Sequence, residues 1–439
     1  MKVHGTTADP SGRDRRRAFV GASIGNGIEW YDFAVYGSVA VYIGASFFPS
    51  GDPVAELMKS FAVFGLSFLL RPLGGLFFGP LADRIGRKKV MVTVLVMMSA
   101  STALIGVLPT HANIGAWSAV LLVSMRCIQG FSAGGEFGSV SSFLTEYAGP
   151  GRRGFSTSWM MFSTVVGFMV GSAVSASLLF GIGESAMASW GWRVPFLLAA
   201  PLGLISVYIR LKLEDTPAFV RMAESGDVSR APLREVVATC RRSLFVAAGI
   251  ATLHATAFYV VFTFMVGYLG STLGHGGSIS LGSTLAAGAV ALLLLPLCGR
   301  LSDRVGRRPV LLAGSVGFLV LAIPMFALAS SGSVIGAVIA QMVLAALLAI
   351  FISTSVVTMA ELFPARVRSA GVSVGYNLPA AVFGGMAPFV ATWLISQSGD
   401  TRAPSLYLVA AAIVAIVAVA AFLGSTLRGV AMTEGSSDA

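Results

Sequence analysis

The chain has 439 residues, of which 55% are hydrophobic and 11% are charged, and its formal net charge is +10. A soluble domain carries about 25% charged residues, so this composition excludes an ordinary water-soluble protein and indicates a chain solvated mostly by lipid. The positive charge does not indicate a nucleic-acid partner, because the basic residues gather in alternate loops between apolar stretches.

Twelve apolar stretches follow one another, six on each side of a polar central segment. Each runs for about 20 to 30 residues, enough to cross a hydrocarbon core of about 30 Å. The predicted membrane helices span residues 19–48, 57–82, 90–109, 116–146, 155–180, 192–211, 244–270, 281–301, 309–330, 333–361, 370–397 and 404–427. The expected fold class is an all-α integral membrane protein with twelve transmembrane helices in two pseudo-symmetric six-helix bundles.

The predicted helices divide the chain into five parts. A cytoplasmic N-terminal tail (1–18) precedes the first six-helix bundle (19–211). A central cytoplasmic loop (212–243) leads to the second bundle (244–427), which a short cytoplasmic tail (428–439) follows. The central loop alternates apolar and basic residues, which favours a short amphipathic surface helix. The polar start of the chain predicts no cleavable signal peptide.

The basic residues predict the orientation in the membrane. Twenty-five of the 30 lysines and arginines lie in one set of alternate loops, and the opposite loops hold little basic charge. Basic loops remain on the cytoplasmic side of a membrane. We therefore expect a multi-pass protein of the inner (cytoplasmic) membrane, with both termini and the central loop in the cytoplasm.

The first predicted helix carries charges where a membrane helix is normally apolar. Glu29, Asp32 and Tyr36 are spaced i, i+3 and i+7, which places them on one helical face. An ionisable side chain in mid-membrane costs about 2.5 to 3.5 kcal/mol, so this face is expected to look inward. A carboxylate that is removed from water and unpaired is readily protonated, as a proton-coupled carrier requires.

Further charges lie inside the second and fourth predicted helices. Arg71 is near the middle of the second, and Arg126, Gln129 and Glu136 share a face of the fourth. Arg71 either serves a transport site or neutralises a carboxylate of the first helix. Arg126 binds either a substrate carboxylate or a protein acid. Glu136 is either a site residue or the fixed partner of Arg126 or of another basic residue.

One charged phrase occurs once in each half. GPLADRIGRKKVMV at 79–92 matches GRLSDRVGRRPVLL at 299–312, and a duplicated six-helix unit is typical of alternating-access transporters. Each phrase connects two helices, so we predict a cytoplasmic gate. Anchoring of the topology is the alternative. The candidate gate residues are Gly79, Asp83, Arg84, Gly86, Arg87, Lys88, Asp303, Arg304, Gly306 and Arg307.

The helix predicted over 244–270 carries a hydrogen-bonding stripe of Thr252, Thr256, Tyr259 and Thr263. The stripe faces either neighbouring helices or the transport cavity. The complete set of candidate substrate-binding or proton-coupling residues is Glu29, Asp32, Tyr36, Arg71, Arg126, Gln129, Glu136 and Tyr259.

Two other features of the helices are expected to be structural. His254 lies off the threonine stripe and is expected to be a core residue rather than a proton relay. Small residues permit close helix contact in membranes, and this is predicted at Gly167, Gly171, Gly384 and Gly385.

No metal, cofactor or catalytic residue is expected. The three cysteines lie far apart, only four histidines occur, and no metal-ligand spacing or serine–histidine set is present. A membrane enzyme is therefore disfavoured. A membrane sensor is also disfavoured, because no appended sensory domain is recognisable.

Several phrases resemble a known family. The loop phrase at 79–92, repeated at 299–312, resembles the signature of the major facilitator superfamily. GNGIEWYDFAVYG, RPLGGLFFGPLADRIGRKK, RCIQGFSAGGEFG, WGWRVPFLL and LEDTPAF together resemble its metabolite:proton symporter branch. Within this branch, FFPSGDP and PLGLISVYIRLKLEDTPAF are most similar to the proline/betaine transporters. Two features depart from that group: Arg126 stands where the resemblance implies lysine, and the last residues lack the heptads of a coiled coil.

We predict a secondary active transporter that imports a small carboxylated metabolite by proton symport. The resemblance implies an osmolyte such as proline or glycine betaine. The alternative is proton symport of an organic acid such as citrate, 2-oxoglutarate, shikimate or a dicarboxylate. The expected partners are the small-molecule substrate, protons and the lipid bilayer. The proton gradient is the expected energy source, and the monomer is the expected functional unit.

Overall fold

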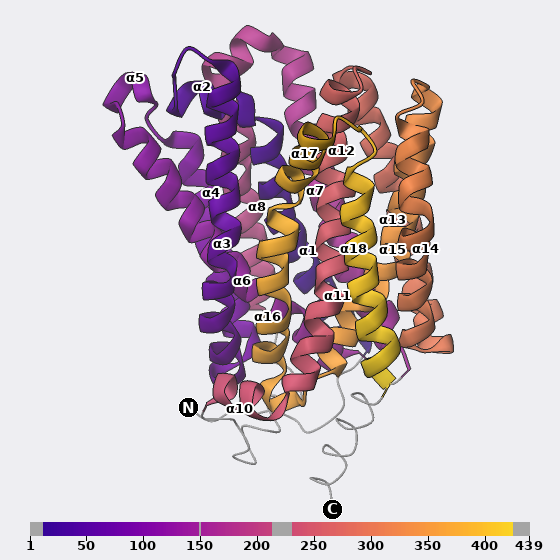
Figure 1. Ribbon diagram of the computed structural model, residues 1–439. Coiled ribbons are helices and arrows are strands. Elements are labelled where there is room, and N and C mark those ends of the chain that lie inside the picture. Colours follow the sequence, from indigo (N-terminus) through magenta and orange to yellow (C-terminus); the bar gives the residue numbers. More distant parts are fainter. Residues whose placement is uncertain (1–11, 149–150, 213–230, 425–439) are drawn as a thin grey trace, which may run out of the picture.

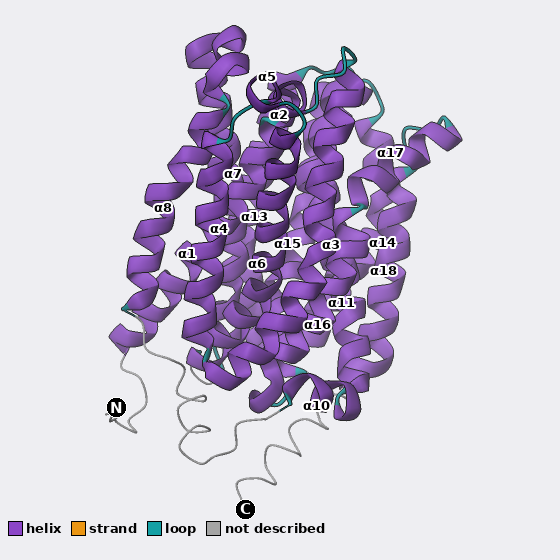
Figure 2. Ribbon diagram, turned by 90° about the vertical axis from the view of Figure 1, so that its left-hand side faces the viewer, coloured by secondary structure: helices purple, strands orange, loops and turns teal. Residues whose placement is uncertain are grey.

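The computed structural model describes residues 12–148, 151–212 and 231–424. Within these ranges the chain forms helices and loops with no strand, as Figure 2 shows. The predicted tail at 428–439 and most of the predicted central loop lie outside the described residues. The division of the chain into five parts stays a prediction.

In the first half, the first predicted helix is interrupted at Val39, which separates α1 (Gly12–Ser38) from α2 (Ala40–Phe47). The short α5 (His111–Ile114) precedes the fourth long helix, and the π-helical η1 (Met187–Gly191) leads into the sixth. The other long helices of this half are α3 (Pro53–Ile85), α4 (Arg87–Val107), α6 (Trp117–Tyr147), α7 (Arg153–Ala186) and α8 (Arg193–Leu211).

In the second half, π-helical segments extend or divide three of the long helices. The first runs through α11 (Arg241–Tyr259), η2 (Val260–Phe264), α12 (Met265–Gly267) and η3 (Tyr268–Thr272). Three regular helices follow, α13 (Gly277–Val305), α14 (Arg307–Ala329) and α15 (Val334–Glu361). After the 3-10 turn η4 (Ala365–Val367) come α16 (Arg368–Pro379), η5 (Ala380–Gly385), α17 (Ala387–Ser398), α18 (Pro404–Val417) and η6 (Ala418–Leu423).

Ten of the described helices are long and apolar enough to cross a membrane. α1 and α6 are not among these ten, and they are the two helices that carry Glu29, Asp32, Arg126 and Glu136, all of them buried. The long helices run side by side in Figure 1. With α1 and α6 counted, the twelve-helix architecture predicted from the sequence is confirmed. α1 and α6 therefore place buried charged side chains inside the helix bundle.

Both copies of the charged phrase turn at a glycine. Gly86, between α3 and α4, has a φ of 107°, and Gly306, between α13 and α14, has a φ of 92°. Residues with a side chain are strained in this region of φ, whereas glycine adopts it freely. The duplicated phrase thus builds the same helix–turn–helix unit in each half.

The two halves meet where α16 lies against α3 and α6, and where α13 lies against α7. A Cβ atom on Gly138 of α6 would lie 2.7 Å from the carbonyl oxygen of Ser369, and one on Gly154 of α7 would lie 2.7 Å from that of Gly299. These backbones are therefore too close for any residue but glycine. The predicted close contacts at Gly167, Gly171, Gly384 and Gly385 are also confirmed.

The described end of the central loop forms a short surface helix, α10 (Pro232–Thr239), at one end of the molecule (Figure 1). Pro232 and Val236 are buried, whereas Arg234 is exposed, so α10 is amphipathic. Glu235 forms an ion pair of 2.6 Å with Arg366 in η4. The surface helix predicted for the central loop is thus confirmed within the described residues.

Candidate functional site

A buried acid–base network joins α1 to α6. Arg126 donates a hydrogen bond of 2.7 Å to Gln129, and its guanidinium lies 3.5 Å from a carboxylate oxygen of Asp32. Gln129 donates to the same carboxylate oxygen at 2.9 Å and to Thr102 of α4 at 2.8 Å. The fold therefore brings together three predicted site residues, Asp32, Arg126 and Gln129.

Tyr36 lies beside this network and fixes its arginine. The guanidinium carbon of Arg126 lies 3.9 Å from the centre of the Tyr36 ring, and the Tyr36 hydroxyl donates to the Ser60 carbonyl at 3.0 Å. A buried cation–π contact of this kind contributes about 2 kcal/mol. Nε and Nη2 of Arg126 have no hydrogen-bond partner among the described residues. These two donors are available to an anion.

Glu29 and Arg71 form a second pair, between α1 and α3. Their closest nitrogen and oxygen atoms are 3.5 Å apart, and both side chains are buried. The guanidinium lies on the rings of Phe33 and Phe68, at 4.6 and 4.5 Å from the ring centres. Nε of Arg71 has no partner among the described residues. The sequence alternative in which Arg71 neutralises a carboxylate of the first helix matches this geometry.

Glu136 pairs with Arg210 of α8 and not with Arg126. Both nitrogens of the Arg210 fork donate to the Glu136 carboxylate, and one also donates to the Met91 carbonyl at 2.8 Å. Arg210 is fully buried and was not among the predicted site residues. It stands at the end of a helix, next to the basic central loop, where an arginine is normally interpreted as a topology signal. Of the two alternatives for Glu136, the structure favours a fixed partner.

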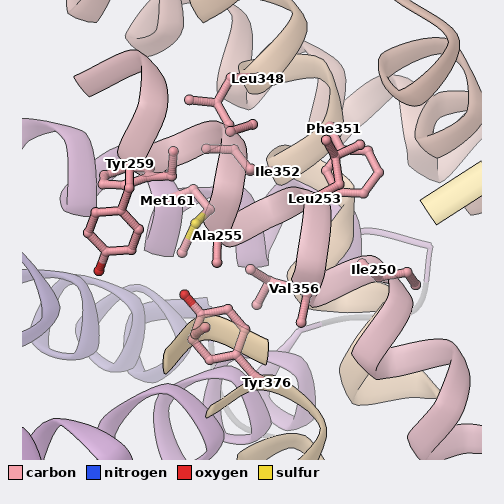
Figure 3. Packing of buried hydrophobic residues seen from close by; sticks show 14 of the residues in the cluster. Met161, Ile250, Leu253, Ala255, Tyr259, Leu348, Phe351, Ile352, Val356 and Tyr376 are labelled. Atoms are coloured by element: carbon pink, nitrogen blue, oxygen red, sulfur yellow. The ribbon is translucent and has the colours of Figure 1, made fainter. Parts of the chain in front are cut away.

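The second half contributes tyrosines to the same region. Tyr259 and Tyr376 are both buried, and both lie within electrostatic range of Arg71 and Glu29. Figure 3 shows their hydroxyl groups pointing toward the same space. The Tyr259 hydroxyl has no hydrogen-bond partner among the described residues. Tyr376 was not predicted, because one tyrosine in an apolar helix gives no signal of its position.

Two other polar residues of α11, Thr252 and His254, form hydrogen bonds within the described residues. Thr252 donates to the Ala248 carbonyl of its own helix at 2.9 Å. Nδ1 of His254 lies 2.7 Å from the Ser355 hydroxyl of α15, and the ring is buried. His254 is thus a core residue, as the sequence predicts.

The first copy of the charged phrase bonds directly to the other half. The Asp83 carboxylate accepts hydrogen bonds from the backbone N–H groups of Ser369 and Ala370, at 3.3 and 2.8 Å, where α16 begins. Arg87 lies 3.1 Å from Asp83 and 3.3 Å from Glu146, and it donates to the Ala365 carbonyl at 2.7 Å. A carboxylate at a helix N-terminus is favoured by the helix dipole.

The second copy repeats the arrangement with the halves exchanged. Asp303 accepts from the backbone N–H groups of Gly154 and Phe155, both at 2.8 Å, where α7 begins. Arg307 lies 2.7 Å from Asp303 and 3.0 Å from Glu361. Each phrase therefore binds a helix start of the opposite half.

The remaining gate candidates have different positions. A Cβ atom on Gly79 would lie 3.0 Å from Ser373, so this glycine permits close approach of α16. Arg84 and Arg304 are exposed, and Lys88 is half-buried. Bonds between the halves also involve Arg368, which lies 3.3 Å from Glu146. That pair was not among the gate residues predicted from the sequence.

Comparisons with known proteins place this arrangement in a family. Residues 18–238 match the family model of the sugar (and other) transporters, and residues 247–432 match that of the major facilitator superfamily. A proline/betaine transporter of Escherichia coli (strain K12) is 38% identical, over 92% of this chain and 82% of the relative. The glycine betaine/proline/ectoine/pipecolic acid transporter OusA of Dickeya dadantii (strain 3937) is 37% identical over the same shares.

The chain belongs to the major facilitator superfamily. The resemblance to its proline/betaine transporters that the sequence indicated is confirmed, and the chain is a transporter rather than an enzyme. Among solved structures, the proton:xylose symporter XylE bound to 6-bromo-6-deoxy-D-glucose superposes with a TM-score of 0.78 at 15% identity, covering 94% of this chain and 95% of that one. At that identity the likeness concerns the fold.

The chain is thus a multi-pass membrane protein. The described residues contain no group of three or more histidine, cysteine, aspartate or glutamate side chains placed to hold a metal ion. The buried polar groups of the site are acids, arginines, amides and tyrosines, which suit a polar organic solute and a proton.

Proposed function

We propose that this transporter imports a small zwitterionic osmolyte, of the proline or glycine betaine kind, together with a proton. The observation that carries the proposal is the balance of buried charge. Apart from Asp83 and Arg87 of the charged phrase, which pair with each other, the described residues of the first half bury three acids and three arginines: Glu29, Asp32, Glu136, Arg71, Arg126 and Arg210. In the second half, the apolar runs 243–299, 309–360, 369–399 and 403–427 contain no aspartate, glutamate, lysine or arginine.

A balanced interior favours a substrate with no net charge. Moving an uncompensated charge into a low-dielectric region is costly, so a neutral site suits a zwitterion better than a dicarboxylate or tricarboxylate. The relatives named as carriers of proline, betaine and ectoine point in the same direction. Organic-acid symport is the second candidate, and the two unpartnered donors of Arg126 are the observation that favours it.

Glu29 is our choice for the acid that takes up the transported proton. Its pair with Arg71 is long, at 3.5 Å, so protonation sacrifices little bonding. Asp32 is held more firmly, by Gln129 at 2.9 Å and by Arg126. Asp32 is the alternative coupling acid. The proton gradient supplies the energy, and no cofactor is required.

The two charged phrases form the cytoplasmic gate in this proposal. Asp83 and Asp303 each bind the start of a helix in the opposite half, so the halves are joined at the end of the molecule where α10 lies. Breaking both sets of bonds would let the halves separate at this end and open the site to the cytoplasm. The monomer contains both halves and is the proposed functional unit.

The test is uptake by the purified protein in proteoliposomes with an acidic exterior. We expect labelled glycine betaine and proline to accumulate against their concentration gradients, and a protonophore to abolish the accumulation. Labelled citrate and 2-oxoglutarate serve as the comparison. Accumulation of either acid without accumulation of betaine or proline would replace the proposal with organic-acid symport.

A further inference from the structure

Four aromatic side chains pack together between the halves. We call Trp30 and Phe33 of α1, Phe68 of α3 and Tyr259 of α11 the aromatic box. The ring centres of Phe33 and Phe68 are 5.4 Å apart, those of Phe68 and Tyr259 are 5.2 Å apart, and those of Trp30 and Tyr259 are 6.2 Å apart. All four side chains are buried. Three belong to the first half and one to the second, so the box crosses the interface at which the halves move apart.

Three rings of the aromatic box, those of Trp30, Phe33 and Phe68, hold a cation, the Arg71 guanidinium. Its carbon lies 4.5 Å from the ring centre of Phe68, 4.6 Å from that of Phe33 and 5.8 Å from that of Trp30. A cation within about 6 Å of an aromatic face is attracted to it, most strongly where water is excluded. The hydrogen bond from Arg71 to Glu29, at 3.5 Å, is long for a bond between two charged groups. The rings therefore make a large contribution to holding Arg71.

We propose that the aromatic box is the subsite for the cationic end of a zwitterionic substrate, a quaternary or secondary ammonium, which replaces the Arg71 guanidinium on the rings. This inference rests on the proposed function. A proton from outside binds the Glu29 carboxylate and removes the negative charge that faces Arg71. The substrate carboxylate then binds Arg71 in place of Glu29, while the ammonium takes the ring faces that Arg71 leaves.

The exchange preserves the pairing of the buried groups. The zwitterion supplies an anion for the arginine and a cation for the rings, so neither is left without a partner in the membrane interior. An organic acid has no cation for the box, and the electron-rich ring faces do not attract a carboxylate. The box would therefore separate zwitterions from organic acids.

The test compares two ligands of the same shape. Glycine betaine carries a quaternary nitrogen, whereas 3,3-dimethylbutyrate carries a neutral quaternary carbon in its place. Each competes with labelled betaine for the wild-type protein in proteoliposomes. We expect betaine to bind about 2- to 30-fold more tightly, which is the range of a single cation–π contact.

Substitutions locate the effect in the box. Phe68→Leu keeps an apolar side chain but removes a ring, so the affinity for betaine should fall by about 2- to 30-fold and that for 3,3-dimethylbutyrate should stay unchanged. Phe68→Tyr keeps a ring and should retain the preference for betaine. Phe318→Leu is the matched control: the same exchange at a buried position on α14, which should alter neither affinity.

Equal affinities for the two ligands in the wild-type protein would overturn the inference, and so would equal losses for both ligands in Phe68→Leu. The wild-type comparison holds even where the variant fails to fold. Failure of the proposed function has a different signature, because the wild-type protein would then transport neither betaine nor proline. If betaine is transported but both ligands bind with equal affinity, the inference about the aromatic box is wrong and the proposed function still holds.

Discussion

Arg71 and Arg126 hold their carboxylates in different ways. Arg126 is bound by Gln129 at 2.7 Å, pairs with Asp32 and lies on the Tyr36 ring, so several groups would have to move before it could. Arg71 is held by one long contact with Glu29 and by the faces of the aromatic rings. We infer that Arg71 changes partner during transport, whereas Arg126 holds Asp32 in place.

Matched substitutions separate these two roles. Lysine keeps the charge but loses the two-pronged geometry of the guanidinium. Arg71→Lys should raise the apparent KM for betaine by about 10- to 150-fold, the range of hydrogen bonds to charged groups, and Arg126→Lys should change it much less. Initial uptake rates over a range of betaine concentrations measure both. The reverse order would make Arg126 the arginine that binds the substrate.

A neutral residue at the coupling acid should separate substrate movement from proton movement. Glu29→Gln cannot take up a proton, so we expect it to lose accumulation driven by a pH gradient while exchange of internal for external betaine continues. Asp32→Asn tests the alternative acid. Glu56→Gln is the control, because Glu56 is bonded to the loop N–H groups of Ser50 and Gly51. Uphill accumulation in both Glu29→Gln and Asp32→Asn would place the coupling group elsewhere.

At the scale of elements, each half binds the other at the start of a helix, which is α7 in the first half and α16 in the second. Each presents two backbone N–H groups to a carboxylate of the opposite half. The hydrogen bonds to Asp303 are shorter than the 3.3 Å bond from Ser369 to Asp83. Glycines let the backbones approach beside these contacts. Both sets of hydrogen bonds, at Asp83 and at Asp303, must therefore break before the halves can separate at this end.

Weakening the hydrogen bonds at one of these helix starts should make this end of the molecule open more often. Asp303→Asn replaces a charged acceptor by an amide, which offers one acceptor oxygen to the two N–H groups. The reporter is Ser158→Cys, in a protein without its native cysteines, because Ser158 is fully buried against Gly299. We expect Asp303→Asn to increase the rate of labelling by a thiol reagent severalfold. An unchanged rate would show that Asp303 does not hold the interface closed.

Hydropathy predicted the helices of this fold, and the duplicated phrase predicted a connection between two helices in each half, which the structure places at Gly86 and Gly306. The break between α1 and α2 was not predicted, although it directly follows Gly37 and Ser38, a pair of small residues at which helices can kink. The partner of Glu136 was not predicted either: the sequence offered Arg126 or another basic residue, and helix packing selects Arg210. Phe68 was missed for a related reason: in a membrane helix, an apolar residue is equally common on the lipid side and inside.

At the scale of the whole molecule, the alternation of basic loops predicts which end faces the cytoplasm. Gly183 and Gly274 lie in segments predicted to be outside, and α10 belongs to the loop predicted to be inside. We expect a membrane-impermeant thiol reagent added to intact cells to label Gly183→Cys and Gly274→Cys. It should not label Thr239→Cys, an exposed position of α10, until the cells are opened. Labelling of Thr239→Cys alone in intact cells would reverse the orientation.

The balance of buried charge extends over the whole molecule. In the first half, three buried acids balance three buried arginines, Asp83 balances Arg87, and the apolar runs of the second half contain no charged residue. A zwitterion adds no net charge to this interior, so the transported proton is the one uncompensated charge in the loaded carrier. Each transport cycle should therefore move positive charge into the cell, and a negative interior should accelerate uptake.

The current that accompanies substrate addition tests this account most directly. Proteoliposomes adsorbed on a solid-supported electrode, at equal pH on both sides, are exposed to a rapid change of glycine betaine concentration. We predict an inward positive current that saturates with betaine, is absent with citrate and is lost in Glu29→Gln. Betaine uptake without any current would contradict the account, and so would a current evoked by citrate but not by betaine.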